Sequence, residues 1–297
     1  MNITAVIILY NSDIKSSETI QSLLNTQKKN INLNIIIWNN GPKQLEINEC
    51  KEFESIFNKQ NVQISIYENT NNIALSKIYN FFIIKENFDF FSILDQDSIL
   101  ASDFFQNILL NNTFDIIIPF IYSANWRTKE KSLCYPIYAQ SEKLLDKATF
   151  EMGEIESIAS GLTISHKLIN YLFQTKTQIF NESYALYAID TCFFIDLKKL
   201  NNTNFKGLCI GKINHSLNFN LHNQAQISPT RKLEMDYSKI LNKLLYENKT
   251  SIKVLLYILR KFVRKEYSLN VFLKLSRCLI AKKHPRCYKP IKARRLL

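Results

Sequence analysis

The hydrophobic pattern of the first hundred residues alternates between two periods. Four short runs are apolar and rich in β-branched residues, as in buried parallel strands: Ile3–Tyr10, Leu33–Trp38, Val62–Tyr67 and Phe90–Leu94. Three stretches between them have helical spacing: Ile14–Gln27, with a predicted cap at residues 11–13, Leu45–Asn58 and Ile73–Lys85. Strands that alternate with helices predict an α/β fold with a mostly parallel central sheet flanked by helices.

The pattern loosens after about residue 115. The segments expected there are a strand at Asp115–Ile121, a strand at Ile155–Ile164 broken by Ser160-Gly161, and a helix at His166–Phe173. Residues 122–150 are polar and irregular, which predicts a loop-rich insertion, and residues 201–226 show little regular signal.

The C-terminal region has the pattern of basic amphipathic helices. In residues 251–265 the apolar side chains share one helical face: Ile252, Leu255, Leu256, Leu259, Phe262 and Val263. Residues 269–279 also combine apolar residues, mostly leucines, with lysine and arginine. We therefore expect a main domain over residues 1–225 and a basic helical extension over residues 226–297. The apolar face of this extension either packs on the body or lies in a membrane interface.

Composition narrows the possible classes. A length of 297 residues with 46% hydrophobic and 22% charged residues is typical of a globular chain with one large domain or two modest ones. The five glycines form neither G-x-G-x-x-G nor G-x-x-x-x-G-K, so a Rossmann dehydrogenase or a P-loop NTPase is not expected. Six cysteines without a C-x-x-C motif indicate reduced thiols and a cytoplasmic setting. Neither an apolar run of membrane-spanning length nor a signal peptide is expected.

The positive charge is concentrated at one end of the chain. The formal net charge is +12, and residues 251–297 contain 14 Lys and Arg against one acid, Glu266. The first 250 residues are left with a net charge of −1. A basic segment favours an anionic partner, either nucleic acid or the anionic face of a membrane. A nearly neutral body disfavours nucleic acid, and the amphipathic spacing favours a membrane surface.

Candidate chemistry lies where the predicted strands end. Ligands of open α/β sheets bind outside the carboxyl ends of the strands, where this chain has Tyr10-Asn11, Asn39-Asn40 and Asp95-Gln96-Asp97. Two carboxylates separated by one residue repel each other unless a cation neutralises them. Carboxylate pairs suit Mg²⁺ or Mn²⁺, which take their remaining ligands from water and substrate phosphates.

A succession of short motifs resembles glycosyltransferase family 2, and most closely its rhamnosyltransferase-like branch. The motifs are VIILYN at 6–11, IIWNN at 36–40, Glu68-Asn69 with Asn72-Ile73-Ala74, LDQDS at 94–98, Ser160-Gly161, FNESYALYAID at 180–190 and INHSL at 213–217. This resemblance implies the GT-A fold and a nucleotide-sugar donor, for the branch dTDP-L-rhamnose. Asn39 stands where the family usually has aspartate, and Ile189 stands where an acidic neighbour often precedes the base.

The resemblance also implies a role for each matching residue. Tyr10, Asn11 and Asn39 would line the nucleoside pocket, and Asp95 and Asp97 would hold the metal and the diphosphate. Asp190 would be the catalytic base that deprotonates the acceptor, giving inversion at the anomeric carbon. His215 would be a late ligand of the metal or diphosphate. The metal would be Mg²⁺ or Mn²⁺.

The sequence therefore predicts an inverting, metal-dependent glycosyltransferase that moves a sugar, expected to be L-rhamnose, onto a glycan or lipid-linked glycan acceptor. We expect it on the inner face of the bacterial cytoplasmic membrane, bound through the C-terminal basic helices, in surface polysaccharide synthesis. One alternative keeps the enzyme class but transfers galactose, galactofuranose or glucose. Another class remains open: a non-catalytic basic protein that binds a membrane or nucleic acid.

Overall fold

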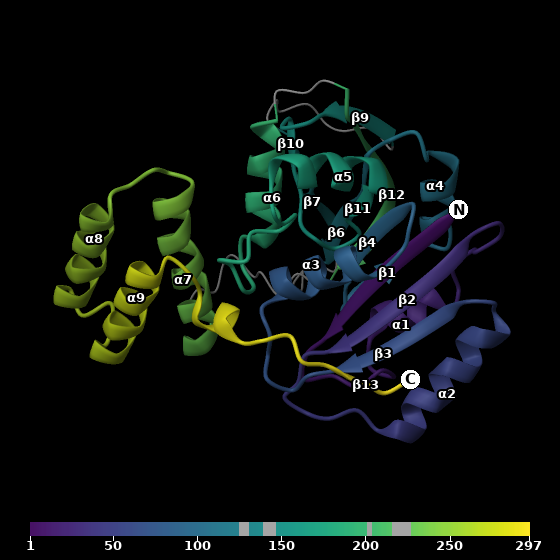
Figure 1. Ribbon diagram of the computed structural model, residues 1–297, viewed down its shortest axis with the longest axis horizontal. Helices are drawn as coiled ribbons and strands as arrows, with labels where there is room; N and C mark the ends of the chain where they lie inside the picture. Colours follow the sequence, from purple (N-terminus) through teal and green to yellow (C-terminus); the bar gives the residue numbers. More distant parts are fainter. Residues whose placement is uncertain (125–130, 139–146, 201–203, 216–226) are drawn as a thin grey trace.

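The chain folds around one mixed sheet (Figure 1). The computed structural model describes residues 1–124, 131–138, 147–200, 204–215 and 227–297. Within these residues the sheet has eleven strands, in the order β13-β3-β2-β1-β4-β11-β6-β12-β5, with β7 beside β6 and β9 beside β12. Helices cover both faces, so the expected α/β class with a largely parallel centre is confirmed.

The first half consists of the predicted βαβ units. Its strands are β1 (Asn2–Leu9), β2 (Asn32–Asn39), β3 (Gln63–Glu68) and β4 (Phe90–Asp95), and the pairs β1–β2, β2–β3 and β1–β4 are parallel. Its helices are α1 (Glu18–Leu23), α2 (Ile47–Lys59) and α3 (Leu75–Lys85). The predicted strands and the last two helices are confirmed to within two residues.

The first helix is much shorter than predicted, and its predicted cap is wrong. The side chain of Ser17 caps α1 by accepting a hydrogen bond from Ile20 N. Asp13 caps only a turn, because its carboxylate accepts from Ser16 N at 2.8 Å. Aspartate and serine side chains compete with helix formation by bonding nearby backbone groups. The chain therefore forms a turn first, and the helix begins at Glu18, four residues after the predicted start at Ile14.

Two hydrophobic layers lie on opposite faces of the sheet. Alternate residues of β1 face opposite layers, as the strand period requires: Ile7 belongs to the layer that contains α1, α2 and α4 (Phe104–Leu110), whereas Val6 belongs to the layer that contains α3 and continues into the later helices. The later helices are α5 (His166–Thr175), α6 (Ile189–Lys198), α7 (Pro229–Leu245), α8 (Ser251–Val263) and α9 (Leu269–Ala281). Both faces of the central strands are therefore buried, which explains their unbroken apolar runs.

The second half is more regular than the sequence predicts. Its strands are β5 (Ser98–Leu100), β6 (Ile116–Ala124), β7 (Lys131–Tyr135), β8 (Ile137–Tyr138), β9 (Lys147–Glu151), β10 (Ile155–Glu156), β11 (Thr163–Ser165) and β12 (Lys206–His215). The expectation of a loop at 122–150 is wrong for β7, β8 and β9, while its residues 125–130 and 139–146 lie outside the described ranges. The expectation of little structure at 201–226 is wrong for β12.

Tertiary pairing explains β12, whose own sequence has a weak strand pattern. It lies beside β6 in parallel and beside β5 and β9 antiparallel. Gly207 allows the ring of Phe150 to lie against its backbone, since a Cβ there would come within 2.0 Å of that ring. Glycine weakens an isolated strand, so the local pattern underestimates a strand that neighbours hold on both sides.

The C-terminal region is helical and then returns to the sheet. The helices predicted at 251–265 and 269–279 are confirmed as α8 and α9, which pack with α7 at the end of the molecule far from the sheet. Residues 284–297, which we call the C-terminal strap, run back through the short helix η2 (Pro285–Tyr288) to β13 (Arg294–Arg295). The strand β13 pairs antiparallel with β3. None of the described helices combines the length and apolar character needed to cross a bilayer.

Candidate active site

A cavity of about 410 Å³ opens at the carboxyl edge of the sheet. Four of the predicted site residues line it: Asp95, Asp97, Asp190 and His215. They come from the end of β4, the turn after it, the first turn of α6 and the last residue of β12. Residues up to 120 positions apart in the sequence therefore face one space.

Asp95 and Asp97, the aspartate pair, are held by the loop that follows β1. The side chain of Gln96 between them accepts a hydrogen bond from Tyr10 N at 2.7 Å and donates to Tyr10 O at 3.3 Å. The hydroxyl of Thr19 accepts from Ser98 N at 2.8 Å and also contacts the carbonyl of Asp95. These contacts fix the turn, so that both carboxylates project into the cavity while about one third of each side chain stays exposed.

His215 reaches the aspartate pair from the other side. Its Nε2 lies 3.2 Å from Asp95 Oδ2 and 3.5 Å from Asp97 Oδ1, and β12 holds it in register opposite Ser98 of β5. Burial alone would lower the pKa of His215, but the hydrogen bond to Asp95 and the two negative charges raise it above its usual value. The predicted grouping of His215 with the aspartate pair is therefore present in the structure.

These three side chains are the predicted donors of a divalent cation. Two carboxylates and one imidazole are suitable donors for Mn²⁺, and the carboxylates also suit Mg²⁺. Within the described ranges, no set of three or more histidine, cysteine or acidic side chains is arranged as a ready metal centre. The donors therefore fit a divalent ion that takes further ligands from water and a phosphate group. His215 Nδ1, which is buried without a partner, faces away from this grouping as the second ring nitrogen.

Asp190 is half-buried and lines the same cavity, and its protonation is set by its surroundings. Burial raises its pKa to about 6, and the negative charge of Asp95 adds to this. Hydrogen bonds from Thr191 N (2.8 Å) and Ala159 N (3.3 Å) act in the opposite direction. The residue before the helix, Ala188, has a positive φ of 67°, an unfavourable conformation for alanine that turns the chain sharply into α6. Asp190 is thus a carboxylate whose pKa is raised to about 6.

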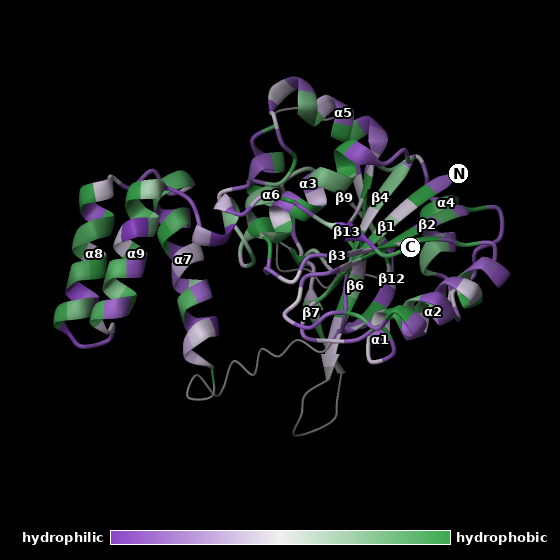
Figure 2. Ribbon diagram, turned by 60° about the horizontal axis from the view of Figure 1, so that its bottom comes forward, coloured by the Kyte–Doolittle hydropathy of each residue, from purple (hydrophilic) through white to green (hydrophobic). Residues whose placement is uncertain are grey.

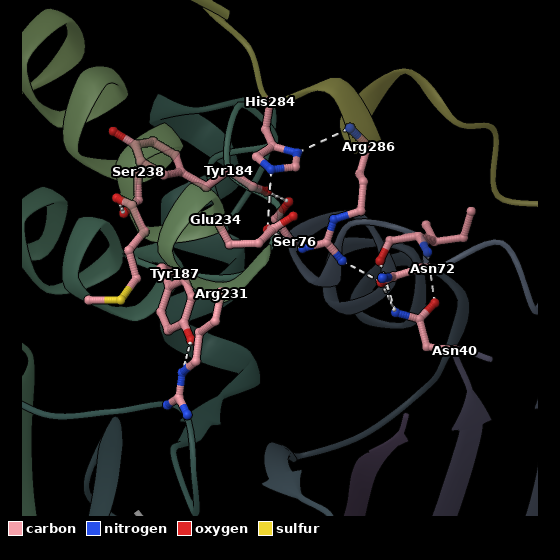
Figure 3. Close-up of polar contacts among 12 residues, drawn as sticks. Asn40, Asn72, Ser76, Tyr184, Tyr187, Arg231, Glu234, Ser238, His284 and Arg286 are labelled. Carbon is pink, nitrogen blue, oxygen red and sulfur yellow. Dashed lines mark hydrogen bonds and ion pairs between the residues drawn. The ribbon is translucent and has the colours of Figure 1, made fainter. Parts of the chain in front are cut away.

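Arg231 brings a cation into this acidic cavity, and no role is predicted for it from the sequence. It lies in the first turn of α7, and its Nε donates to the hydroxyl of Tyr187 at 2.8 Å (Figure 3). Tyr79 and Tyr135 also line the cavity. No local motif marks these residues, since they reach the site only through the packing of α3, α7 and β7.

Tyr10, Asn11 and Asn39, the other predicted donor residues, are not among the residues that line this cavity. Tyr10 is half exposed, and Asn11 lines a second cavity of about 420 Å³ together with Asp13 and Lys43. The backbone N–H of Asn11 donates to Gly41 O at 2.7 Å, which joins the loops after β1 and β2. Contact of Tyr10 and Asn11 with a nucleoside stays a prediction.

Asn39 is committed to the protein itself. Its amide nitrogen donates to Lys43 O at 2.7 Å and to Glu68 Oε2 at 3.0 Å, and its oxygen accepts from Gly41 N at 3.0 Å. The side chain is fully buried and shapes the turn that follows β2. Its predicted contact with the donor also stays a prediction, while its observed role is to hold this turn.

The C-terminal strap is tied to the same edge of the sheet (Figure 3). Arg286 donates to Glu234 Oε2 of α7 at 2.6 Å and contacts Asn72 in the loop before α3. His284 Nε2 lies 3.2 Å from the same oxygen of Glu234. Asn40 bonds the residue after Asn72: its side-chain oxygen accepts from Ile73 N at 2.8 Å, and its side-chain nitrogen donates to Ile73 O at 2.9 Å. The strap thus links the helical extension to the loops at the cavity edge.

Structural comparison gives this arrangement a context. No family model and no curated protein matches the sequence. The structure is similar to S. aureus TarS (TM-score 0.53, 14% identity), covering 97% of this chain but only 50% of TarS. It is also similar to GalNAc-T7 with UDP, GalNAc and Mn²⁺ (0.52, 13%, covering 72% and 43%). A third similar structure is the Pyrobaculum calidifontis mannosyltransferase PcManGT with GDP-Man and Mn²⁺ (0.52, 8%, covering 82% and 64%).

These similar structures are GT-A-type glycosyltransferases, and the fold expected from the sequence, GT-A, is therefore confirmed. At such low identity the likeness concerns the fold alone. Neither glycosyltransferase family 2 nor its rhamnosyltransferase-like branch is singled out by it.

Proposed function

We propose that this protein is a metal-dependent glycosyltransferase that uses a nucleotide-sugar donor. The observation that carries the proposal is that Asp95, Asp97, His215 and Asp190 line one cavity at the carboxyl edge of a GT-A sheet. TarS 1–349 crystallised with UDP-GlcNAc, and PcManGT with GDP-Man and Mn²⁺, support a nucleotide sugar and a divalent ion for a fold of this kind.

The aspartate pair and His215 would hold the divalent ion, Mg²⁺ or Mn²⁺. When bound there, the ion offsets the negative charge that develops on a departing nucleoside diphosphate. Arg231, which lines the same cavity, supplies a second positive charge for the diphosphate. Leu186 and Ile189 add apolar side chains to the lining of the same cavity.

Asp190 acts as the general base. With a pKa of about 6 it is mostly deprotonated at neutral pH and still basic enough to accept a proton. It takes the proton of an acceptor hydroxyl as the hydroxyl oxygen bonds to the anomeric carbon. The bond between this carbon and the diphosphate oxygen breaks on the opposite side, and the configuration inverts. Its two backbone hydrogen bonds keep the carboxylate oriented during this step.

The resemblance of the sequence motifs to the rhamnosyltransferase-like branch supports the choice of donor and acceptor. We propose dTDP-L-rhamnose as donor and a glycan or lipid-linked glycan as acceptor, in bacterial surface polysaccharide synthesis. The alternative is galactose, galactofuranose or glucose carried by the same machinery. The reaction would take place in the cytoplasm, where nucleotide sugars are substrates and lipid-linked acceptors face the inner side of the membrane.

A screen of nucleotide sugars with Mn²⁺ tests the proposal. The true donor at about 100 times its dissociation constant stabilises the fold by roughly 2.7 kcal/mol, which is visible as a rise in melting temperature. We expect the same donor to release nucleoside diphosphate in the presence of an acceptor. Asp190→Asn should keep the thermal shift and greatly reduce the release, whereas Asp97→Asn should weaken both.

The control is Asp103→Asn, an exposed aspartate just before α4 that lies outside the cavity. It should behave as the wild type. If no nucleotide sugar of any class shifts the melting temperature with either metal, the transferase proposal is wrong, and a non-catalytic binding protein becomes the better explanation.

A further inference from the structure

The outer face of the helical extension is apolar and exposed, although it is far from the cavity. On α8 the helix contributes Val254 and Ile258 to the hydrophobic core. A second apolar stripe of the same helix faces solvent: Ile252, Leu255, Leu256, Leu259 and Val263. Ile252 is 71% exposed and Val263 is 70% exposed. The apolar face expected from the sequence therefore does not pack on the body, except that Phe262 is half-buried.

The stripe continues onto α9. Leu269, Leu273 and Ile280 of α9 are exposed, and Ile280 is 83% exposed. Phe262 of α8 and Phe272 of α9 touch at the seam between the helices, with ring centroids 4.9 Å apart. With 100° per residue, both stripes lie on the same side of this contact, so together they form one surface, the α8–α9 face. Figure 2 shows hydrophobic residues along both helices at the end of the molecule away from the sheet.

Positive charge borders the α8–α9 face. The exposed residues Lys253, Arg260 and Arg264 follow one flank of α8, and Lys274 and Arg277 follow the outer flank of α9. The acid in this part of the chain, Glu266, is paired with Lys261 at 2.5 Å. An exposed apolar surface with a cationic border on both sides is the arrangement of helices that lie in a membrane interface.

The charges also disfavour other occupants. A second copy of this chain docked through the same face would bring like-charged borders together, which costs free energy. A nucleic acid would leave the eight exposed apolar side chains uncovered, because its backbone offers phosphates and no apolar surface. An anionic bilayer complements both parts at once, since acyl chains cover the apolar stripe and lipid phosphates meet the border.

We propose that the α8–α9 face docks the protein on an anionic membrane surface, with both helices lying parallel to the bilayer. Leucine, isoleucine and valine side chains enter the headgroup region, and the lysines and arginines bind lipid phosphates. Docking through this face leaves the cavity on the other side of α7 free to receive an acceptor. A lipid-linked acceptor would then be concentrated near the cavity, a consequence that rests on the proposed function.

Vesicle flotation of the full chain tests the docking. We expect the protein to float with vesicles of phosphatidylcholine and phosphatidylglycerol and to stay behind with phosphatidylcholine alone, with binding that weakens as salt is raised. The pair Lys253→Glu and Arg260→Glu should weaken binding roughly fivefold or more for each cation removed. The pair Ile252→Ser and Leu256→Ser should weaken it roughly tenfold, because less apolar surface enters the bilayer.

Matched controls make these losses specific. Lys51→Glu with Lys59→Glu on α2 changes the net charge equally, and Ile84→Ser with Leu110→Ser removes exposed apolar residues from the body. Both controls should float as the wild type, and circular dichroism should show all variants folded. Vesicle binding needs no sugar donor, so its loss and the loss of donor turnover are separate results.

Three outcomes would overturn the docking proposal. One is equal flotation of the wild type with both kinds of vesicle, or unchanged flotation of the α8–α9 variants. A second is a dimer in sedimentation that Ile252→Ser with Leu256→Ser converts to a monomer, which would make the face an interface between copies. A third is retention on a DNA or RNA duplex at physiological salt without vesicle binding.

Discussion

The cavity and the α8–α9 face use ionisable side chains in opposite ways. In the cavity the charged groups are close enough to shift one another: His215 contacts both aspartates, and Asp95 raises the pKa of Asp190. On the α8–α9 face the cations stand apart along two helical flanks and border exposed apolar residues. Catalysis in the cavity would therefore depend on the positions of individual atoms, whereas membrane binding by the face would depend on the sum of many weak contributions.

This difference predicts different responses to substitution. Removing one group from the cavity changes the charge balance of all the others, because buried charges interact strongly. Removing one cation from the outer face costs about 1 kcal/mol of membrane binding and leaves the rest unchanged. Variants of the cavity should thus alter turnover without altering vesicle binding, and variants of the face should do the reverse.

The largest expected effect is that of Asp190→Asn. Loss of the base should lower turnover by roughly 10²–10⁴-fold, measured as nucleoside diphosphate release at saturating donor. Vesicle binding should not change. Turnover within a few-fold of the wild type would show that another group accepts the proton.

The same variant should be more stable than the wild type at neutral pH. The folded-state pKa of Asp190, about 6, is above the usual 3.8. The folded protein therefore has its full stability below pH 3.8, where Asp190 is protonated in both states, and loses part of it as the pH rises through 6. Above that pH the buried charge costs up to about 3 kcal/mol, and neutral asparagine removes this cost but weakens one backbone hydrogen bond. We expect a net gain of about 1–2 kcal/mol in thermal unfolding without metal or donor. The gain should disappear when both proteins are compared well below pH 4.

Asp97→Asn should have the next largest effect. Loss of one carboxylate weakens the hold on the divalent ion, which supplies several kcal/mol of stabilisation to the leaving diphosphate, so turnover should fall roughly 10²-fold or more. A titration with Mn²⁺ should show that more metal is needed for half-maximal activity. Unchanged metal dependence would contradict the placement of the ion at the aspartate pair.

The pH dependence of turnover is a smaller effect, and it should be seen for the cavity but not for the α8–α9 face. Asp190 works only when deprotonated, so turnover at saturating donor should fall about tenfold for each pH unit below about 6. If the base had the pKa of an ordinary exposed aspartate, turnover would fall only below about pH 4. Vesicle binding should be nearly constant over the same range, since lysine and arginine stay charged.

The smallest effect expected is that of Arg286→Ala in the C-terminal strap, which lies between the two regions. Arg286 contacts Glu234 and Asn72, so its loss should lower stability by roughly 1–3 kcal/mol and raise the KM for the donor a few-fold. The kcat and the vesicle binding should change little. The matched control Arg295→Ala removes an exposed strap arginine near Ser65, away from Glu234. If the KM for the donor is unchanged in Arg286→Ala, the strap has a structural role only.

Local sequence patterns are enough to predict much of the first hundred residues and of the helical extension. Strand and helix periods locate β1 to β4, α2, α3, α8 and α9, and the position of Asp95-Gln96-Asp97 after a buried strand indicates where a ligand would bind. These features are local, because an alternation of apolar and polar residues depends only on neighbours in the chain. The helical spacing of residues 251–265 likewise predicted an amphipathic helix, but not which of its faces would be exposed.

The remaining features depend on how distant segments pack together. The strand β12 exists because β6, β5 and β9 surround it, and it alone carries His215 to the aspartate pair. The raised pKa of Asp190 comes from burial by segments distant in the sequence, and Arg231 enters the cavity only through the packing of α7. The strap returns from the end of the chain to β3 and Asn72. Burial and the distances between charges arise when remote segments pack together, so no local pattern contains them.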